Sequence, residues 1–310
     1  MLEKVNKLGK TKIFSKEAKP LQTHNNDKFL SLLYLEKSPK NQKNHGGARY
    51  SGLFKNSLNT LPLISIIMPN FNEQNLSKAI DSVLDQSYPN IELIVIDGGS
   101  GEDVTNLLSK YEDDIDIWIS EKDKNLWDAW NKGFLLARGD FVGVVDSSNT
   151  LYKNSIDILN NYIAKNDKFD FLCGTVKKDN KIYAGFRPND IDRQFNIIPS
   201  TVVGFYVKLN SLKKVGLLNI NYKIQSDYDW LYRMIVTNEM KGINTKGDEV
   251  FGDLGESNFS SKFSFFPRLL NELKIRLHNK QNKWFLLYIF FGRIVMRSYK
   301  VTTKLLKSKK

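Results

Sequence analysis

Cysteine and histidine are scarce in this sequence. Cys173 is the only cysteine in 310 residues, which excludes a disulfide within the chain and any zinc or iron–sulfur site built from several cysteines. The three histidines are scattered through the two flanks, so a histidine-rich metal site is not expected. This usage is typical of a reducing compartment, and we expect a cytoplasmic protein.

The sequence also has no long hydrophobic run. The longest apolar stretch, residues 284–296, is 13 residues long and is interrupted by Gly292 and Arg293, whereas a helix needs about 20 apolar residues to span a bilayer. The N-terminus is basic, but no apolar segment follows it, so we expect no secretory signal. Neither a transmembrane nor a secreted protein is therefore predicted.

The glycine patterns of common nucleotide-binding and hydrolase sites are missing as well. The first apolar strand, expected at residues 63–68, is followed by a loop at 69–73, and no glycine comes before Gly98. A dinucleotide-binding turn needs glycines there so that its backbone can approach a pyrophosphate. No P-loop and no G-x-S-x-G pattern is present either. These absences disfavour an NAD or FAD enzyme, a P-loop NTPase and an α/β-hydrolase.

What the chain does have is an uneven distribution of charge. The net charge of +12 divides into +8 for residues 1–60, −8 for residues 61–261 and +12 for residues 262–310. We expect a basic, partly disordered extension, a folded body and a basic helical tail within these bounds. A nucleic-acid enzyme usually carries its positive charge on the folded working face. Basic flanks fit attachment to an anionic surface better, so nucleic acid is not an expected partner.

Short apolar strands alternate with amphipathic helices through the first part of the body. We expect strands at 63–68, 91–96, 115–119 and 141–145, and helices at 76–85, 104–111 and 126–137. This alternation predicts an α/β fold with a mostly parallel sheet. Ligands of such sheets bind at the carboxyl ends of the strands, which makes Asp97 and Asp146 candidate site residues. Alternatively, each of them only caps the helix that follows.

Outside residues 62–145 the sequence predicts a less regular series of helices and strands. Upstream, a short helix is expected at 29–36 and a linker at 38–51, with the organised part beginning at Pro62. Downstream, we expect a helix at 153–165, strands at 169–175 and 197–208, a solvated hairpin at 177–180, and helices at 211–215 and 226–236. Trp127 and Trp130 lie at helical spacing and are expected in the core, as is Cys173. Two helices are expected in the tail, at 265–310.

Five segments in order and spacing, at 64–72, 82–100, 118–133, 137–143 and 222–230, resemble the family 2 glycosyltransferases. The second of them contains Asp97-Gly98-Gly99, and the last contains Asp227. The resemblance implies a GT-A fold and an inverting transfer of a sugar from a nucleotide-diphosphate sugar, usually a UDP-sugar. It further implies that the following residues line the nucleotide-sugar site: Pro69, Asn72, Asp97, Asp123, Asp128, Lys132 and Asp146.

The resemblance also implies a catalytic base and a metal ligand. Asp227 matches the carboxylate taken as base, with Asp229 as its near alternative, and Asp146 matches the first acid of the D-x-D motif that holds Mn²⁺ or Mg²⁺. The acids that usually follow are replaced by Ser148 and Asn149. Because these ions prefer charged oxygen ligands, we expect a weakened metal site. A further departure lies at residues 202–203, two valines where related sequences often carry His-Gln on the acceptor side.

The tail predicts a basic amphipathic helix with aromatic residues on its apolar side, which is typical of binding to an anionic membrane surface. Alternatively, this helix packs on the body or forms a dimer. The prediction is a glycosyltransferase on the cytoplasmic face of a bacterial membrane, acting on a glycan or lipid-linked acceptor in polysaccharide or lipopolysaccharide biosynthesis. The alternative is a catalytically impaired protein of the same fold that binds a nucleotide sugar or a partner enzyme.

Overall fold

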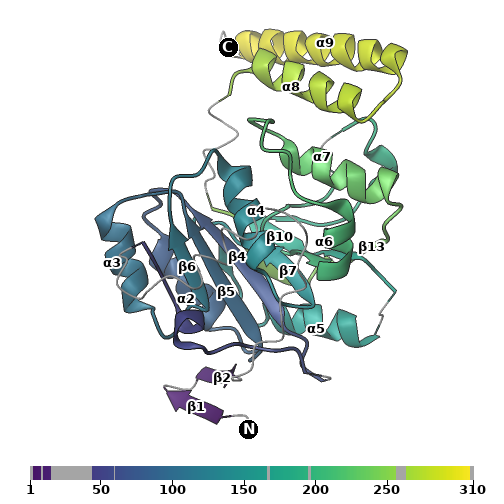
Figure 1. Ribbon diagram of the computed structural model, residues 1–310. Helices are drawn as coiled ribbons and strands as arrows, with labels where there is room; N and C mark the ends of the chain where they lie inside the picture. The colour runs from purple at the N-terminus through teal and green to yellow at the C-terminus, as the bar shows by residue number, and fades with distance from the viewer. Residues whose placement is uncertain are drawn as a thin grey trace.

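A central mixed sheet organises the molecule (Figure 1). The computed structural model describes residues 3–7, 10–14, 44–58, 60–165, 168–194, 197–255 and 263–307. The sheet order is β13 (Gly242–Asn244), β9 (Phe171–Cys173), β12 (Phe205–Lys208), β7 (Phe141–Val144), β4 (Ile64–Asn70), β5 (Ile91–Asp97), β6 (Ile117–Ser120) and β3 (His45–Gly46). Strands β4, β5, β6 and β7 are parallel, whereas β12 runs antiparallel to β7 and β9, and β3 antiparallel to β6.

Both faces of this sheet are buried, because apolar side chains occupy successive strand positions. In β5, Leu93 and Val95 enter one hydrophobic core, and Ile94 and Ile96 enter the other. The first core is covered by α2 (Leu76–Leu84), α3 (Glu102–Lys110) and α5 (Ser155–Lys165), and the second by α4 (Leu126–Leu136), α6 (Leu209–Val215) and α7 (Ser226–Tyr232). The predicted α/β architecture is confirmed, with a sheet that is mixed.

A second sheet contains the strands β11 (Lys181–Tyr183), β10 (Thr175–Lys178), β14 (Val250–Asp253) and β8 (Thr150–Leu151) in that order. The β10–β11 hairpin closes through Asp179 and Asn180, both with positive φ (47° and 59°). Two such residues define the type I′ turn that suits the twist of a hairpin, as the sequence predicted. Between Ile197 and β12 the chain is irregular, so the predicted strand at 197–208 is confirmed only over its last four residues.

The C-terminal helices α8 (Phe265–His278) and α9 (Lys283–Lys307) form a layer beyond α7 (Figure 1). Arg276 is fully buried and fastens α8 to the body. Its guanidinium pairs with Glu272 at 2.9 Å, donates to the carbonyl of Asp192 at 2.5 Å and lies 5.3 Å from the ring centroid of Tyr228. The part of the chain that the structure describes contains no helix long and apolar enough to cross a membrane.

The N-terminal flank corrects one expectation. The sequence predicts a linker at 38–51 and an organised part that begins only at Pro62. In the structure, residues 44–58 pack on the sheet: β3 extends it, and the 3₁₀ turn η1 (Ala48–Ser51) buries Arg49. The Arg49 guanidinium pairs with Glu92 of β5. A hairpin of β1 (Glu3–Lys7) and β2 (Lys10–Phe14) precedes this segment. The helix predicted at 29–36 lies outside the described residues.

Candidate active site

The carboxyl ends of β4, β5 and β6 meet around one carboxylate. Asp97 ends β5 and is fully buried. One of its oxygens accepts hydrogen bonds from Asn70 Nδ2 at 2.6 Å and Ser100 Oγ at 2.5 Å. The other accepts from Ser120 Oγ at 2.6 Å and from the backbone N–H groups of Gly99 and Ser100 at 3.2 and 2.9 Å. Asp97 therefore fixes the loop that follows its own strand.

These hydrogen bonds occupy the carboxylate of Asp97, which was expected to line the nucleotide-sugar site. A carboxylate has about four lone-pair sites, and five donors already use them. Ser100 Oγ in turn accepts the backbone N–H of Asn72 at 2.8 Å, and Asn72 has a positive φ of 53°. The first loop and the Asp97 loop are thus held together, so a base bound at this edge of the sheet would meet a prearranged surface.

The predicted residues that follow β6 form a compact charged cluster. Lys132 Nζ on α4 lies 2.6 Å from a carboxylate oxygen of Asp123 and 2.6 Å from one of Glu121. Burial raises the pKa of Asp123, although its pair with Lys132 opposes the shift. Asp128 is buried and accepts the N–H of Lys124 at 3.1 Å. Asp123 also approaches Gly98, where an added Cβ would lie 3.1 Å from its carboxylate.

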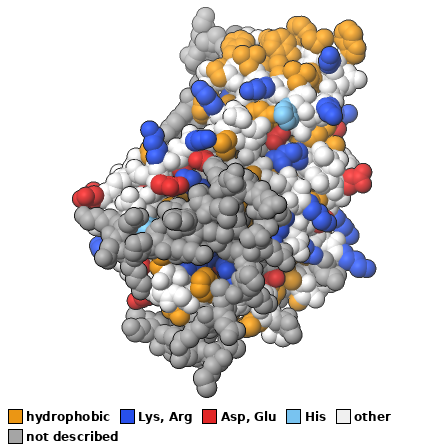
Figure 2. All heavy atoms as spheres, viewed as in Figure 1, with side chains coloured by type: hydrophobic (Ala, Val, Ile, Leu, Met, Phe, Trp, Pro, Cys, Tyr) orange, Lys and Arg blue, Asp and Glu red, His pale blue; other side chains and the backbone are white. Residues whose placement is uncertain are grey.

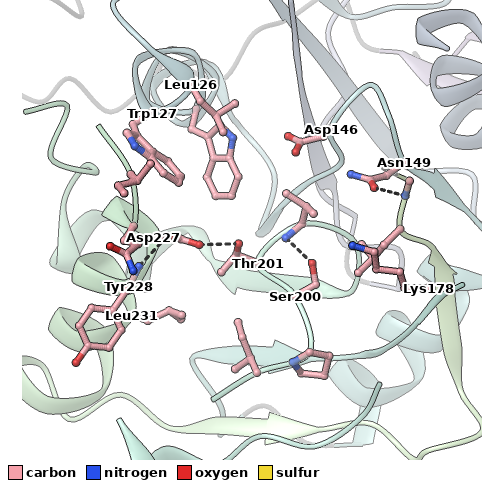
Figure 3. Close-up of a pocket in the computed structure, with 18 of the residues that line it drawn as sticks. Leu126, Trp127, Asp146, Asn149, Lys178, Ser200, Thr201, Asp227, Tyr228 and Leu231 are labelled. Atoms are coloured by element: carbon pink, nitrogen blue, oxygen red, sulfur yellow. Dashed lines mark hydrogen bonds between the residues drawn. The ribbon is translucent and has the colours of Figure 1, made fainter. Parts of the chain in front are cut away.

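A separate pocket of about 350 Å³ opens between β7, α4, α7 and the loop before β12 (Figure 3). Figure 3 draws Asp146, Asn149 and Lys178 on one side of it, and Asp227, Tyr228 and Leu231 on the other. Trp127 and Trp130 are buried as predicted, and their edges form part of the same wall. The pocket thus brings Asp146 and Asp227 together, whereas Asp97, Asp123, Asp128 and Lys132 gather at the ends of β5 and β6.

Asp227 and Asp229, the two candidates for the catalytic base, lie on different sides of α7. Asp227 lines the pocket and accepts Thr201 Oγ1 at 3.2 Å and the N–H of Tyr228 at 3.0 Å. Burial raises its pKa, and these hydrogen bonds oppose the shift. Asp229 instead pairs with Arg233 Nε at 3.0 Å and accepts Asn279 Nδ2 at 2.8 Å. The carboxylate of Asp229, the predicted near alternative, is thus engaged with Arg233 and with the end of α8, and Asp229 is not among the residues that line the pocket.

Asp146 is a strongly perturbed carboxylate in the pocket. Burial, together with the negative charges of Asp227 and Glu73, raises its pKa from 3.8 to about 7. Its Oδ1 is buried without a hydrogen-bond partner among the described residues. The backbone beside it is firmly held, since Ser147 donates to the carbonyl of Pro69 at 3.3 Å. A perturbed, partly unsatisfied carboxylate in a pocket is typical of a functional site.

The donors around Asp146 fit a divalent cation poorly. Mn²⁺ and Mg²⁺ require oxygen ligands, and no group of three or more acidic, histidine or cysteine side chains that could hold a metal occurs in the described ranges. Asn149 turns its Oδ1 away, because that atom accepts the N–H of Gly255 at 2.9 Å. Its Nδ2, a donor, is the buried atom without a partner in the part of the chain described. Asn149, which replaces one of the two acids, therefore presents no oxygen ligand to the pocket.

The loop at residues 200–203 forms the floor of the pocket where the sequence departs from the family pattern. Ser200, Thr201 and Val202 line it, and Val203 is buried with a φ of 45°. A β-branched residue rarely adopts this conformation, and such strain persists only where the surroundings enforce it. The N–H of Val203 donates to Val144 of β7 at 2.9 Å, which ties the strained loop to the sheet.

Sequence analysis did not anticipate two basic residues in this pocket. Lys178, expected on a solvated hairpin, lines it from β10, and Arg268 lines it from α8. Consecutive lysines at 177 and 178 gave no indication of which side chain faces the pocket. Arg268 lies in the tail, for which the sequence predicts membrane binding or, alternatively, packing on the body or a dimer, but no part in the site. With two arginines among its 14 residues, α8 gave no indication that one of them lines this pocket.

The arrangement of a GT-A sheet with acids at its strand ends agrees with the comparisons. The family model of glycosyl transferase family 2 matches residues 65–240. An uncharacterized glycosyltransferase of Rickettsia typhi is 29% identical over 188 residues, covering 56% of this chain and 59% of that protein. The chain thus matches less than two thirds of that relative's length.

Solved structures show the same fold at low sequence identity. S. aureus TarS 1–349 in complex with UDP-GlcNAc has a TM-score of 0.57 and 16% identity, covering 74% of this chain and 72% of that one. Mannosyltransferase PcManGT from Pyrobaculum calidifontis, in complex with GDP-Man and Mn²⁺, has a TM-score of 0.52 and 14% identity, covering 91% of this chain and 86% of that one. The fold is that of GT-A glycosyltransferases. The chain belongs to glycosyl transferase family 2.

Proposed function

We propose that this chain transfers a sugar from a nucleoside-diphosphate sugar, most simply a UDP-sugar, to a hydroxyl of a glycan or lipid-linked acceptor with inversion. The observation that carries the proposal is the pocket in which Asp227 faces Asp146 within a family 2 chain. Solved neighbours in complex with UDP-GlcNAc and GDP-Man support the donor class. The product would belong to a surface polysaccharide or lipopolysaccharide.

The proposed step is a single displacement. The acceptor oxygen attacks the anomeric carbon while the bond from that carbon to the diphosphate oxygen breaks, and its electron pair leaves with the diphosphate. Asp227 accepts the proton of the attacking hydroxyl, a role that its raised pKa favours. Thr201 holds the carboxylate in place through its hydroxyl. Asp97 acts as a positioning residue, because it fixes the two loops at the nucleotide edge.

Nucleotide binding tests the proposal most directly. Thermal unfolding should be measured with UDP, GDP and CDP, each in EDTA and in Mn²⁺. A ligand at about 100 times its Kd adds roughly 2.7 kcal/mol to the free energy of unfolding, a rise in Tm of roughly 5 °C. We expect one nucleotide to give such a shift. If none of the three changes Tm in either condition, the nucleotide-sugar function is wrong.

We further propose that α9 lies on an anionic membrane surface. Trp284, Tyr288, Phe291, Val295 and Tyr299 follow one another at helical spacing and are all exposed, Trp284 by 79%. Figure 2 shows hydrophobic side chains gathered over this end of the molecule, with Lys and Arg side chains below them. The opposite side of α9 packs through Leu286 and Ile289, both buried. An apolar stripe of this kind beside basic residues is typical of interfacial helices.

Vesicle sedimentation tests the membrane proposal. Replacing Trp284, Tyr288 and Phe291 together by Ser should reduce binding to phosphatidylglycerol vesicles at least tenfold, because apolar area that enters the interface is lost. Ile182→Ser removes a comparably exposed apolar residue on β11 and serves as the matched control. Equal binding by the triple variant and the control would contradict the proposal. A change from dimer to monomer in the triple variant, with vesicle binding unchanged, would assign the stripe to self-association.

A further inference from the structure

The polar groups around Asp146 differ from those of a metal site. Asn149 stands where the family pattern places an acid. Because the N–H of Gly255 requires an acceptor, Asn149 must direct its Oδ1 toward Gly255 and its Nδ2 elsewhere. That Nδ2 is buried without a partner among the described residues, in a side chain that lines the pocket and is 2% exposed. A position that would supply a metal ligand thus supplies a hydrogen-bond donor.

Two cationic side chains line the same pocket. Lys178 comes from the end of β10 and lies beside Asn149 in Figure 3, and Arg268 comes from the first turns of α8. Neither forms an ion pair within the chain segments that the structure describes. Asp146 and Asp227 line the same pocket, but neither forms an ion pair with Lys178 or Arg268 in the described part of the chain. Two such cations that reach one pocket from separate elements favour an anionic ligand with several charges.

We propose that Lys178, Arg268 and the Nδ2 of Asn149 bind the diphosphate of the donor and supply the positive charge for its departure in place of a divalent metal. This inference rests on the proposed function. When the bond from the anomeric carbon to the diphosphate breaks, the leaving group gains one negative charge. Fixed cations and an amide donor at that position stabilise the charge as a metal ion would. Transfer then proceeds in the absence of divalent ions.

Calorimetric titration of UDP and GDP in EDTA, with uridine and guanosine in parallel, separates diphosphate recognition from base recognition. We expect Lys178→Met and Arg268→Met each to raise the Kd of the bound diphosphate at least tenfold and to leave the Kd of its nucleoside unchanged. Lys178→Arg should restore affinity to within a few-fold. Lys177→Met is the matched control, because adjacent residues of a strand face opposite sides, and it should bind like the unaltered protein.

Asn149→Asp provides the sharpest variant. An aspartate still accepts the N–H of Gly255, so the loop is retained, but the donor becomes a carboxylate. We expect weaker diphosphate binding in EDTA and a new gain in affinity on addition of Mn²⁺. The unaltered protein should change its Kd less than threefold with Mn²⁺.

Two results would overturn this inference while leaving the proposed function intact. One is diphosphate binding that requires Mn²⁺ in the unaltered protein. The other is unchanged diphosphate affinity in both Lys178→Met and Arg268→Met. By contrast, failure of the unaltered protein to bind any nucleoside or nucleotide would reject the proposed function itself, and this inference with it.

Discussion

Asp227→Asn should reduce sugar transfer by roughly 10²–10⁴-fold, the usual contribution of a general base. The amide fits the same space. Its Oδ1 can accept the Tyr228 N–H and its Nδ2 can donate to the Thr201 hydroxyl oxygen, so the pocket keeps its shape. Nucleotide affinity should stay within a few-fold. The measurement is single-turnover transfer beside calorimetric binding of UDP. Near-normal transfer by the variant would exclude Asp227 as the base. If the unaltered protein binds nucleotide but transfers no sugar, the catalytically impaired alternative is favoured.

The matched control for this experiment is two residues away. Asp229→Asn alters a carboxylate of the same helix that pairs with Arg233 and Asn279 outside the pocket. We expect transfer by the folded protein to persist and Tm to fall, because a buried charged pair is broken. Slower transfer in Asp227→Asn, together with a lower Tm but retained transfer in Asp229→Asn, would assign Asp227 as the base.

The acid side of the pH–rate profile gives an independent check on Asp227. A base is active only when deprotonated, and burial raises the pKa of this carboxyl above its ordinary 3.8. Transfer should therefore decline on acidification at a higher pH than an exposed aspartate would give. A profile that is flat down to pH 4 would contradict this assignment.

Arg49→Met should lower the free energy of unfolding by about 3–5 kcal/mol, a large part of the stability of an ordinary domain. Glu92, its partner, is 1% exposed and also accepts Ser65 Oγ at 2.6 Å and the N–H of Arg138 at 3.0 Å. Without Arg49, Glu92 loses the cation with which it pairs and its buried negative charge is left uncompensated by an ion pair in the described residues. Urea denaturation followed by circular dichroism measures the loss.

A second variant tests the reason for that loss. In Arg49→Met combined with Glu92→Gln, the uncompensated charge is removed while the hydrogen bonds to Ser65 and Arg138 can persist. The double variant should therefore recover part of the stability. A loss below about 1 kcal/mol in Arg49→Met would mean that residues 44–58 rest on the sheet without stabilising it.

The elements between residues 62 and 145 could be predicted because their strands are mostly apolar and β-branched, with only single polar residues such as Ser65 and Glu92 inside them. The same reasoning failed for residues 44–58, where burial is achieved by polar side chains. Arg49 and Lys55 are buried through charged partners, Glu92 and Asp116, that lie far away in the sequence. No local sequence pattern indicates such pairs, so the sequence alone predicts a linker in this segment.

The site was predictable in part for a related reason. Strand ends identify Asp97 and Asp146 directly, because topology alone brings them to one edge. Asp227 and Asp229 lie about 200° apart around a helix of 100° per residue, so a spacing of two predicts that only one faces the pocket. The spacing does not indicate which of the two residues faces the pocket. Lys178 and Arg268 reach the pocket from different elements, and their convergence depends on tertiary packing.

If α9 lies on a membrane as proposed, the stacking of α9 on α8 and of α8 on α7 sets the distance between the membrane and the candidate base. Packed helices lie about 8–10 Å apart, so two such steps separate the axis of α7, which carries Asp227, from that of α9 by roughly 20 Å. With α9 resting on a bilayer, an acceptor hydroxyl at the level of the lipid headgroups would fall short of the base. This proposed placement would favour lipid carriers that already bear an extended polar chain.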